Sequence, residues 1–275
     1  MESKSKLKRL WLPVAVMTAM LVVIGTSEAI AQWSRSSDRK VEVFDDDIQP
    51  PRRMIDSPTA GTLRKGSFDT ELRAFPNGGL LGILQIGLTS RWQIGLSYGG
   101  TEVISSNDPS WNPRMQFLTK LQLVSESMAF PGVAVGFEDQ GFGLWVDSLD
   151  RYQIKSKGFF AVASKGYRGI NFTSSLHGGI NYSREDEDDD DVSFFFGADM
   201  IFDNNLGFVA EFDMALNDDR TPRSLGRGRG YLNTGVRWLL LDRVFIEGVL
   251  KDLLQNRHDT DTFGRELRLL YFESF

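Results

Sequence analysis

The sequence predicts an all-β fold: a transmembrane antiparallel up-and-down β-barrel of about 12 strands that follows a cleaved signal peptide. Three observations lead to this prediction. Apolar and polar residues alternate with a period of two over most of the chain beyond residue 65. Short and long connections alternate between these segments, and aromatic residues recur near their ends. Together these features are typical of barrels that cross a bilayer with strands.

The N-terminal part of the chain precedes the predicted barrel. Residues 1–31 have the order of an export signal, with basic residues first, an apolar run over 10–24, and small residues at 29–31 for cleavage. A retained anchor is the alternative, although the run is short for a membrane helix. Residues 32–64 are predicted to be a flexible periplasmic segment. Because 32–60 is rich in Ser, Asp, Arg and Pro, a partial plug of the barrel is the other interpretation.

Residues 65–275 form the predicted outer-membrane barrel. In 92–99, for example, Trp, Ile, Leu and Tyr alternate with Gln, Gly, Ser and Gly. Most segments approach the 9–11 residues that a tilted strand needs to cross a bilayer. The predicted strands are 66–75, 80–89, 92–100, 113–124, 131–138, 152–165, 169–182, 191–202, 206–216, 230–240, 244–254 and 262–273.

The connections predict the topology independently of the strands. Alternate links are short, as at 90–91, 166–168 and 203–205, whereas most of the others are longer and polar. Outer-membrane barrels have short periplasmic turns and longer outer loops. We therefore expect both ends of the barrel to lie on the short-turn side, which requires an even number of strands.

Two further features favour lipid over water around the barrel. Trp92, Trp238 and Tyr271 fall at the predicted short-turn side, and Tyr98, Tyr182 and Tyr231 at the long-loop side, as in two interfacial girdles. The chain also ends in Phe275 after alternating apolar residues, an ending that resembles those read by the outer-membrane assembly machinery, although Glu273 departs from that pattern. A secreted sandwich or lipocalin-like barrel remains the alternative.

The inner face of the predicted barrel carries ionic residues of both signs, which a hydrated lumen accepts more readily than a soluble core. Cross-strand ion pairs that fill and stiffen the barrel are the favoured interpretation, and a selective pore is the other. Glycines 87, 95, 136 and 197 also face inward, which either leaves space or eases strand curvature. The lumen-lining candidates are Arg73, Arg114, Lys120, Glu211, Asp213, Arg237, Glu247 and Arg268.

One stretch resembles a known family. It contains Ser57-Pro58-Thr59-Ala60-Gly61-Thr62-Leu63, then Gly87-Leu88-Thr89, Ile94-Gly95-Leu96-Ser97-Tyr98-Gly99-Gly100, Trp111-Asn112-Pro113 and Gly136-Phe137-Glu138. This is similar to the YjbH-like outer-membrane barrels. The resemblance implies a role in exopolysaccharide production or export. Members of that family are often far longer, so the chain would match one compact barrel, and no family motif marks a catalytic residue here.

Two predicted outer loops carry opposite charges. Seven acidic residues occupy 185–191, and four arginines occur between 220 and 229. Solvated charge runs are the simplest interpretation; the alternative hypothesis is that the two loops meet over the mouth and gate it. The acids lack the spaced ligands and turn glycine of a selective calcium loop, so no metal or cofactor is predicted. The outer-loop candidates are Glu185, Asp188, Asp190, Arg223 and Arg227.

The composition excludes several kinds of site and function. With no cysteine, the chain has no disulfide, thiol nucleophile or lipid-anchored cysteine, and its net charge of −6 argues against nucleic-acid binding. Of the two histidines, His258 falls in a loop. His177 shares a strand face with Ser175, but Gly179 stands where barrel phospholipases place a serine, so a hydrated lumen residue is expected.

The sequence thus predicts a non-catalytic barrel of the bacterial outer membrane, involved in exopolysaccharide production or export. A general small-solute porin and an outer-membrane hydrolase using His177 are the alternatives. The expected partners are outer-membrane lipid, the barrel-assembly machinery, and a polysaccharide with periplasmic export proteins.

Overall fold

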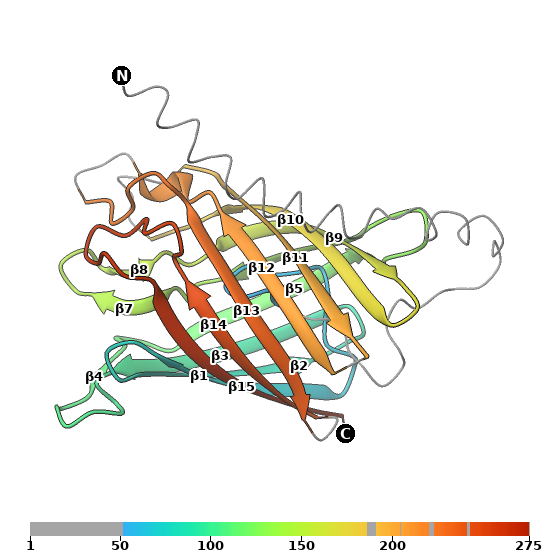
Figure 1. Cartoon of the computed structure of the whole chain (residues 1–275), viewed down its shortest axis with the longest axis horizontal. Helices are drawn as coiled ribbons and strands as arrows, with labels where there is room; N and C mark the ends of the chain where they lie inside the picture. The colour runs from blue at the N-terminus through green and yellow to red at the C-terminus, as the bar shows by residue number, and fades with distance from the viewer. Residues whose placement is uncertain (1–51, 186–190, 204, 220–222, 241–242, 275) are drawn as a thin grey trace.

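The computed structural model describes residues 52–185, 191–203, 205–219, 223–240 and 243–274. Its main body is a closed antiparallel barrel of 12 strands, which confirms the predicted fold class and strand number (Figure 1). The barrel strands are β1 (Ser67–Phe75), β2 (Gly79–Gly87), β3 (Trp92–Thr101), β5 (Gln116–Val124), β6 (Gly132–Glu138), β9 (Gly158–Arg168), β10 (Phe172–Tyr182), β11 (Ser193–Phe202), β12 (Leu206–Asp213), β13 (Tyr231–Leu240), β14 (Val244–Lys251) and β15 (Gly264–Ser274).

Pairing between the first and last strands closes the barrel. Ser67 of β1 faces Ser274 of β15, and each remaining strand pairs with the next long strand along the chain. The turn between β1 and β2 is tight because Asn77 and Gly78 both adopt positive φ, at 63° and 59°. Phe75 pairs with Gly79, so the loop has only three residues, and Asn and Gly adopt positive φ more readily than most residues. Because Ser67 pairs with Ser274, the start of β1 and the end of β15 lie at the same end of the barrel, which is the short-turn end.

Strand alternation produces two different surfaces. Large apolar side chains point outward and stay exposed, such as Trp238 at 51% and Leu269 at 45%. Charged side chains point inward and are buried, such as Arg73 at 1% and Lys120 at 2%. No helix in the described part of the chain is long and apolar enough to cross a membrane.

Several predicted strand boundaries differ from the structure by three or more residues, and positive φ accounts for two of these differences. The predicted strand 113–124 begins at Gln116, so Arg114 is an exposed loop residue and not a lumen-lining one. The predicted strand 152–165 begins at Gly158, whose φ of +58° breaks the extended backbone. The predicted strand 244–254 ends at Lys251 because Asp252 has a φ of 56°.

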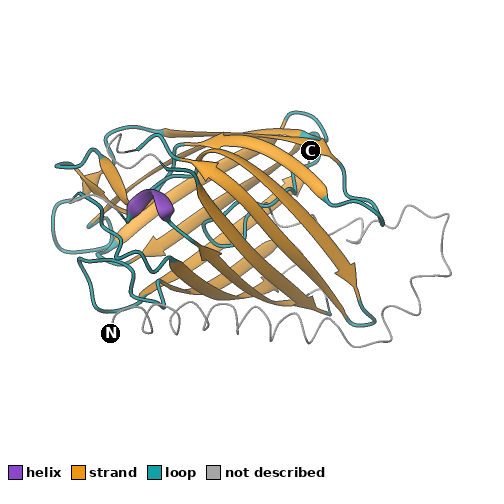
Figure 2. Ribbon diagram, turned by 90° about the horizontal axis from the view of Figure 1, so that it is seen from above, coloured by secondary structure: helices purple, strands orange, loops and turns teal. Residues whose placement is uncertain are grey.

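Further elements gather at the long-loop end. They are the short strand β4 (Ser110–Trp111), the hairpin of β7 (Phe142–Val146) and β8 (Arg151–Ile154), and the 3₁₀ turn η1 (Leu216–Asp218). Figure 2 shows the 3₁₀ turn and neighbouring loops grouped at this end of the barrel. The β7–β8 pair is separate from the barrel sheet and comes from the connection between β6 and β9.

Candidate functional site

A segment of the chain enters the barrel. Residues 52–63, called here the luminal hairpin, fold back on themselves through hydrogen bonds from the Met54 amide to the Ser57 carbonyl (2.9 Å) and from the Thr59 amide to the Arg52 carbonyl (3.2 Å). Ile55 at the tip is 0% exposed. The described part of the predicted 32–64 segment thus differs from a flexible periplasmic arm, because it packs inside the barrel. Residues 1–51 lie outside the described part.

One carboxylate of the barrel wall holds the tip of the hairpin. Glu211 on β12 accepts hydrogen bonds from the amides of Ile55 (3.0 Å), Asp56 (2.9 Å) and Ser57 (3.0 Å). Asn233 donates a fourth bond to the same carboxylate at 2.8 Å. Converging amide groups stabilise a buried negative charge, so Glu211 loses the three backbone donors and keeps Asn233 if the hairpin leaves.

The side chain at the tip binds a different part of the wall, on β14, β15 and β1. The Asp56 carboxylate lies 2.6 Å from Lys251 Nζ, 3.1 Å from Arg73 Nη1 and 3.4 Å from Arg268 Nη2. Arg268 also donates to the Ile55 carbonyl at 2.9 Å. All four charged side chains are at most 6% exposed, so these contacts are shielded from bulk water.

The two arms of the hairpin make further polar contacts with the wall. These contacts come from strands on several sides of the barrel, so the hairpin is held across the lumen. They join Arg52 to Asp69, Arg53 to Glu138, Lys120 Nζ to the carbonyls of Arg52 (2.9 Å) and Thr59 (3.1 Å), and the Leu63 amide to Gln93 Oε1 (2.9 Å).

Apolar packing and two glycines complete the fit. Met54, Ile55 and Ala60 belong to a buried cluster with wall residues that include Phe195. A Cβ at Gly197 would lie 2.2 Å from Met54 Sδ, and one at Gly87 would lie 2.1 Å from the Arg64 carbonyl oxygen. At these two positions the inward glycines leave space for the hairpin.

The β7–β8 hairpin covers the lumen from the long-loop end. Phe142 is 3% exposed, and its ring centroid lies 4.6 Å from Arg73 Cζ and 4.9 Å from Lys251 Nζ. These distances allow cation–π attraction directly above the Asp56 contacts. Phe142 also packs against Leu81 and Tyr231 of the wall. The lumen is therefore covered on both sides of the cationic cluster.

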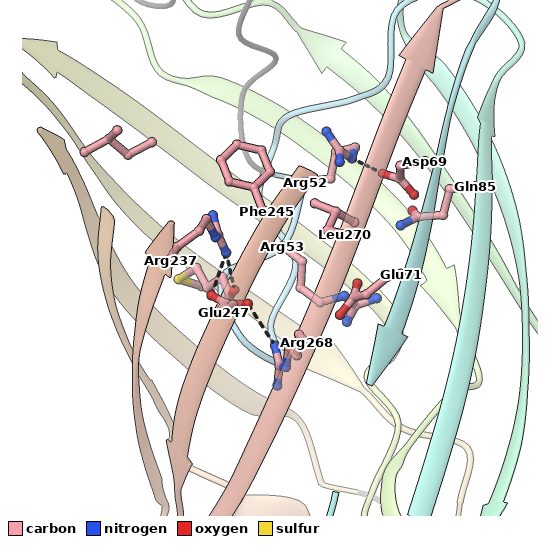
Figure 3. Close-up of a pocket in the computed structure, with 12 residues that line it drawn as sticks. Arg52, Arg53, Asp69, Glu71, Gln85, Arg237, Phe245, Glu247, Arg268 and Leu270 are labelled. Carbon is pink, nitrogen blue, oxygen red and sulfur yellow. Dashed lines mark hydrogen bonds and ion pairs between the residues drawn. The ribbon is translucent and has the colours of Figure 1, made fainter. Parts of the chain in front are cut away.

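The cavity beside the luminal hairpin is smaller than two cavities at the long-loop end. A cavity of about 50 Å³ lies beside the luminal hairpin, between its arginines and β13–β15. Figure 3 shows Arg237, Glu247 and Arg268 linked across this cavity, with Arg52 against Asp69. A second cavity of about 300 Å³ lies at the long-loop end, next to Lys251. The cavity beside the luminal hairpin is therefore narrow.

The lumen-lining candidates are placed as follows. Arg73, Lys120, Glu211, Asp213, Arg237, Glu247 and Arg268 all face the lumen, whereas Arg114 does not. Arg237 pairs with Glu247 at 2.9 Å, and Asp213 pairs with Lys157. Cross-strand ion pairs are thus present, and solute selection by these residues stays a prediction.

The outer-loop candidates are only partly described. Asp188 and Asp190 lie outside the described residues, so the gating hypothesis for the two loops stays a prediction. Arg223 is exposed, and Arg227 pairs with Asp261 at 2.9 Å. Glu185 is buried and accepts a hydrogen bond from the Tyr152 amide of β8 at 3.3 Å. Burial raises the pKa of Glu185 to about 7, against the opposing effects of this bond and of Arg151.

His177 has partners that the sequence did not identify. Its Nδ1 lies 2.8 Å from Ser164 Oγ on β9, and its Nε2 lies 2.6 Å from Asp199 Oδ2 on β11. The predicted neighbour was Ser175, on the same strand. His177 is 7% exposed, so it is buried rather than hydrated. Ser164 Oγ also accepts a hydrogen bond from the Ala60 amide of the luminal hairpin at 2.9 Å, so the hairpin covers Ser164.

The outer surface decides the environment of the barrel. Trp92, Trp238 and Tyr98 are each more than 40% exposed near the two ends of the barrel, as predicted. Tyr231, in contrast, is 2% exposed, and its hydroxyl donates to Asp218. The assignment of Tyr231 to an interfacial girdle was therefore wrong. An apolar exterior around a closed, charged interior suits a bilayer and not water. The protein is a bacterial outer-membrane β-barrel.

Comparison with known proteins adds no family. No protein-family model matches the sequence, and no curated protein is detectably similar to it. Among solved structures, the KdgM porin is 8% identical with a TM-score of 0.44, covering 76% of this chain and 99% of that chain. The outer-membrane protein Omp33 of Acinetobacter baumannii is 9% identical with a TM-score of 0.46, over 76% and 97%. The NanC porin is 9% identical with a TM-score of 0.46, over 75% and 99%.

Likenesses at this level carry no argument about what the chain binds or transports. The barrel rests instead on the strand pairing described above. Among the described residues, no cluster of three or more His, Cys, Asp or Glu side chains is arranged to hold a metal ion.

Proposed function

We propose that this barrel is a non-catalytic passage through the outer membrane, closed at rest by the luminal hairpin, and that it serves the production or export of an exopolysaccharide. The observation that carries this proposal is the hairpin itself, whose amides at 55–57 converge on Glu211. A plug held largely by polar groups can exchange those contacts for water when it leaves.

The charged wall supports a lumen that opens. Lys120, Glu211 and Arg268 are each 2% exposed, and burying such groups permanently is often less favourable than packing apolar residues of similar size. If the wall contacts water when the hairpin leaves, its charged side chains are hydrated in that state. The polar wall therefore favours a removable plug over a permanent core.

The polysaccharide role rests on the family resemblance. Ser57-Pro58-Thr59-Ala60-Gly61-Thr62-Leu63, the most telling part of the similarity to YjbH-like barrels, forms the returning arm of the luminal hairpin. The resemblance thus centres on the element that closes the barrel. The cellular test is deletion of the gene, with reduced secretion of surface polysaccharide as the expected result and unchanged secretion as the result against it.

Planar-bilayer recording tests the closed passage. Wild-type protein should rest closed, and Glu211→Gln should raise the open probability about tenfold or more, because charge-assisted hydrogen bonds contribute about 1.5–3 kcal/mol each. Asp213→Asn is the matched control, since this luminal carboxylate pairs with Lys157, which lies between β8 and β9, and not with the luminal hairpin. Equal opening in both variants would contradict the role of the hairpin.

A general small-solute porin is the second candidate. The 12-stranded barrel and its charged wall favour it, because both suit a water-filled pore. The same recording separates the two functions. A steady open conductance in the wild-type protein, unaffected by Glu211→Gln, would support the porin.

The absence of catalysis is also part of the proposal. Ser164, His177 and Asp199 are linked as in a hydrolytic triad, but the ring nitrogens are reversed relative to the usual serine hydrolase, where Nε2 faces the serine. The Ala60 amide also covers Ser164. We expect wild type and Ser164→Ala to hydrolyse a nitrophenyl ester at the same background rate; a loss of activity in the variant would favour the hydrolase.

A further inference from the structure

The contacts of Asp56 have the form of a ligand in a binding site. Its carboxylate comes from the hairpin tip, whereas all three cations around it come from the barrel wall: Arg73 on β1, Lys251 on β14 and Arg268 on β15. These strands are neighbours in the sheet, so the cations form one patch. If the hairpin leaves, the wall keeps the patch and loses the carboxylate.

Asp56 completes the ion pairs of this patch. The wall supplies four cations, namely Arg73, Arg237, Lys251 and Arg268. It supplies three carboxylates that pair with them, namely Glu71, Glu247 and Glu266. Asp56 contacts three of these cations and is the only carboxylate of the patch that comes from the hairpin. Asp69 of the wall loses its own partner, Arg52, when the hairpin leaves. Three cations that converge on one carboxylate each lose a partner when Asp56 leaves, so another carboxylate can take its place.

We propose that Arg73, Lys251 and Arg268 form a binding site for a carboxylate of the molecule that passes through the barrel, and that Asp56 occupies this site while the hairpin is in place. A monoanion can replace the Asp56 carboxylate, and guanidinium groups suit the planar geometry of a carboxylate. Resting on the proposed function, the inference assigns an acidic saccharide, one that carries uronic acid groups, as the ligand class.

The same arrangement makes the ligand an opener of the barrel. A carboxylate on the passing molecule competes with Asp56 for the three cations, so its binding weakens one of the main contacts of the hairpin tip. The contacts of Glu211 with the backbone amides are separate and remain. The ligand thus promotes opening by competing with Asp56 for Arg73, Lys251 and Arg268.

Acetate binding tests the site directly, because acetate reproduces the end of the Asp56 side chain. Detergent-solubilised full-length Asp56→Ala should bind acetate at least tenfold more tightly than wild type in calorimetry, and should not bind neutral acetamide. The double variant Asp56→Ala/Lys251→Gln should lose this gain in acetate affinity. Arg52→Gln is the matched control, because it removes the contact of the hairpin with Asp69 and leaves the Asp56 carboxylate and its three cations unchanged; it should bind acetate as wild type does.

Several results would overturn the proposal. Equal acetate binding by wild type and Asp56→Ala, or equal binding of acetate and acetamide, would show that there is no carboxylate site. If Asp56→Ala lacks the heat-modifiable migration of a folded barrel, Asp56→Asn takes its place under the same criteria, since it keeps the volume and removes the charge.

Ion-current block tests the ligand class. Glucuronate should interrupt the current through Asp56→Ala at a concentration at least tenfold below that of glucose, and equal block would overturn the saccharide assignment. If no variant conducts, the proposed passage fails, while the acetate titration still decides the site. The two failures are therefore distinguishable.

Discussion

At the scale of single residues, the lumen depends on exact compensation of buried charge by groups far away in sequence. Glu211 meets the amides of a segment about 155 residues earlier, and Arg268 meets the carbonyl of Ile55, which is 213 residues away. Each of these groups would be costly if left alone. Such pairs make the closed state specific, because only one position of the hairpin satisfies all of them.

Glu185 provides a residue-scale prediction about pH. Its pKa is raised by burial to about 7 from an ordinary 4.5, so its contribution to stability is full below about 4.5 and is lost as the pH rises through about 7. We expect protection of the β8 amides 151–154 against hydrogen exchange to fall over this range, after correction for intrinsic rates. Glu185→Gln should flatten the change; an equal slope in both proteins would contradict the prediction.

At the scale of elements, the barrel and the two hairpins have different sources of stability. The strands are held by a continuous backbone ladder between neighbours. The luminal hairpin has only a few internal bonds and depends on the wall for its position. The β7–β8 hairpin likewise depends on Phe142 and its contacts with the cationic patch. Movement is therefore expected in the hairpins before the strands.

Gly197 tests the fit between hairpin and wall. In Gly197→Ala the new Cβ would meet Met54 Sδ at 2.2 Å, and overpacking of this kind costs about 1–3 kcal/mol. We expect trypsin to cleave after Arg53 about fivefold faster or more, with the barrel still resistant. Gly248→Ala is the control, because nothing lies within 4 Å of the place that its new Cβ would occupy. Equal cleavage in both variants would count against a hairpin seated on Gly197.

At the scale of the whole molecule, the protein reverses the usual arrangement of a soluble domain. Charged residues such as Arg73, Lys120 and Glu138 are buried, and large apolar residues such as Leu96 and Leu269 are exposed. The arrangement is stable because lipid surrounds the apolar face and the hairpin fills the charged lumen. Closure of the sheet leaves no free edge among the barrel strands, as a bilayer requires.

Substitution on the lipid face tests the membrane environment. Leu269→Arg, near the middle of β15, should destabilise the barrel in phospholipid vesicles by about 2–4 kcal/mol in urea unfolding, because a charge at the bilayer centre is costly. Leu123→Arg, near the short-turn end of β5, should cost much less. Equal and small effects would instead indicate a surface in contact with water.

Much of the barrel could be predicted from the sequence. The period of two, the alternating connections and the outward aromatics Trp92 and Trp238 indicated the strand number and faces, because each is a local pattern. Errors arose where one residue altered the backbone, as Gly158 and Asp252 did through positive φ. Tyr231 was misplaced because its burial depends on Asp218, a distant partner that alternation does not show.

The sequence by itself determined the fold class, the outward apolar face and the luminal position of residues such as Arg73 and Glu211. Only the tertiary structure decided that residues 52–63 fill the lumen, that Asp56 completes a cationic patch, and that His177 joins Ser164 to Asp199. The reason is physical: strand faces follow from neighbouring residues, whereas these contacts form only after the barrel closes and brings distant strands around a common axis.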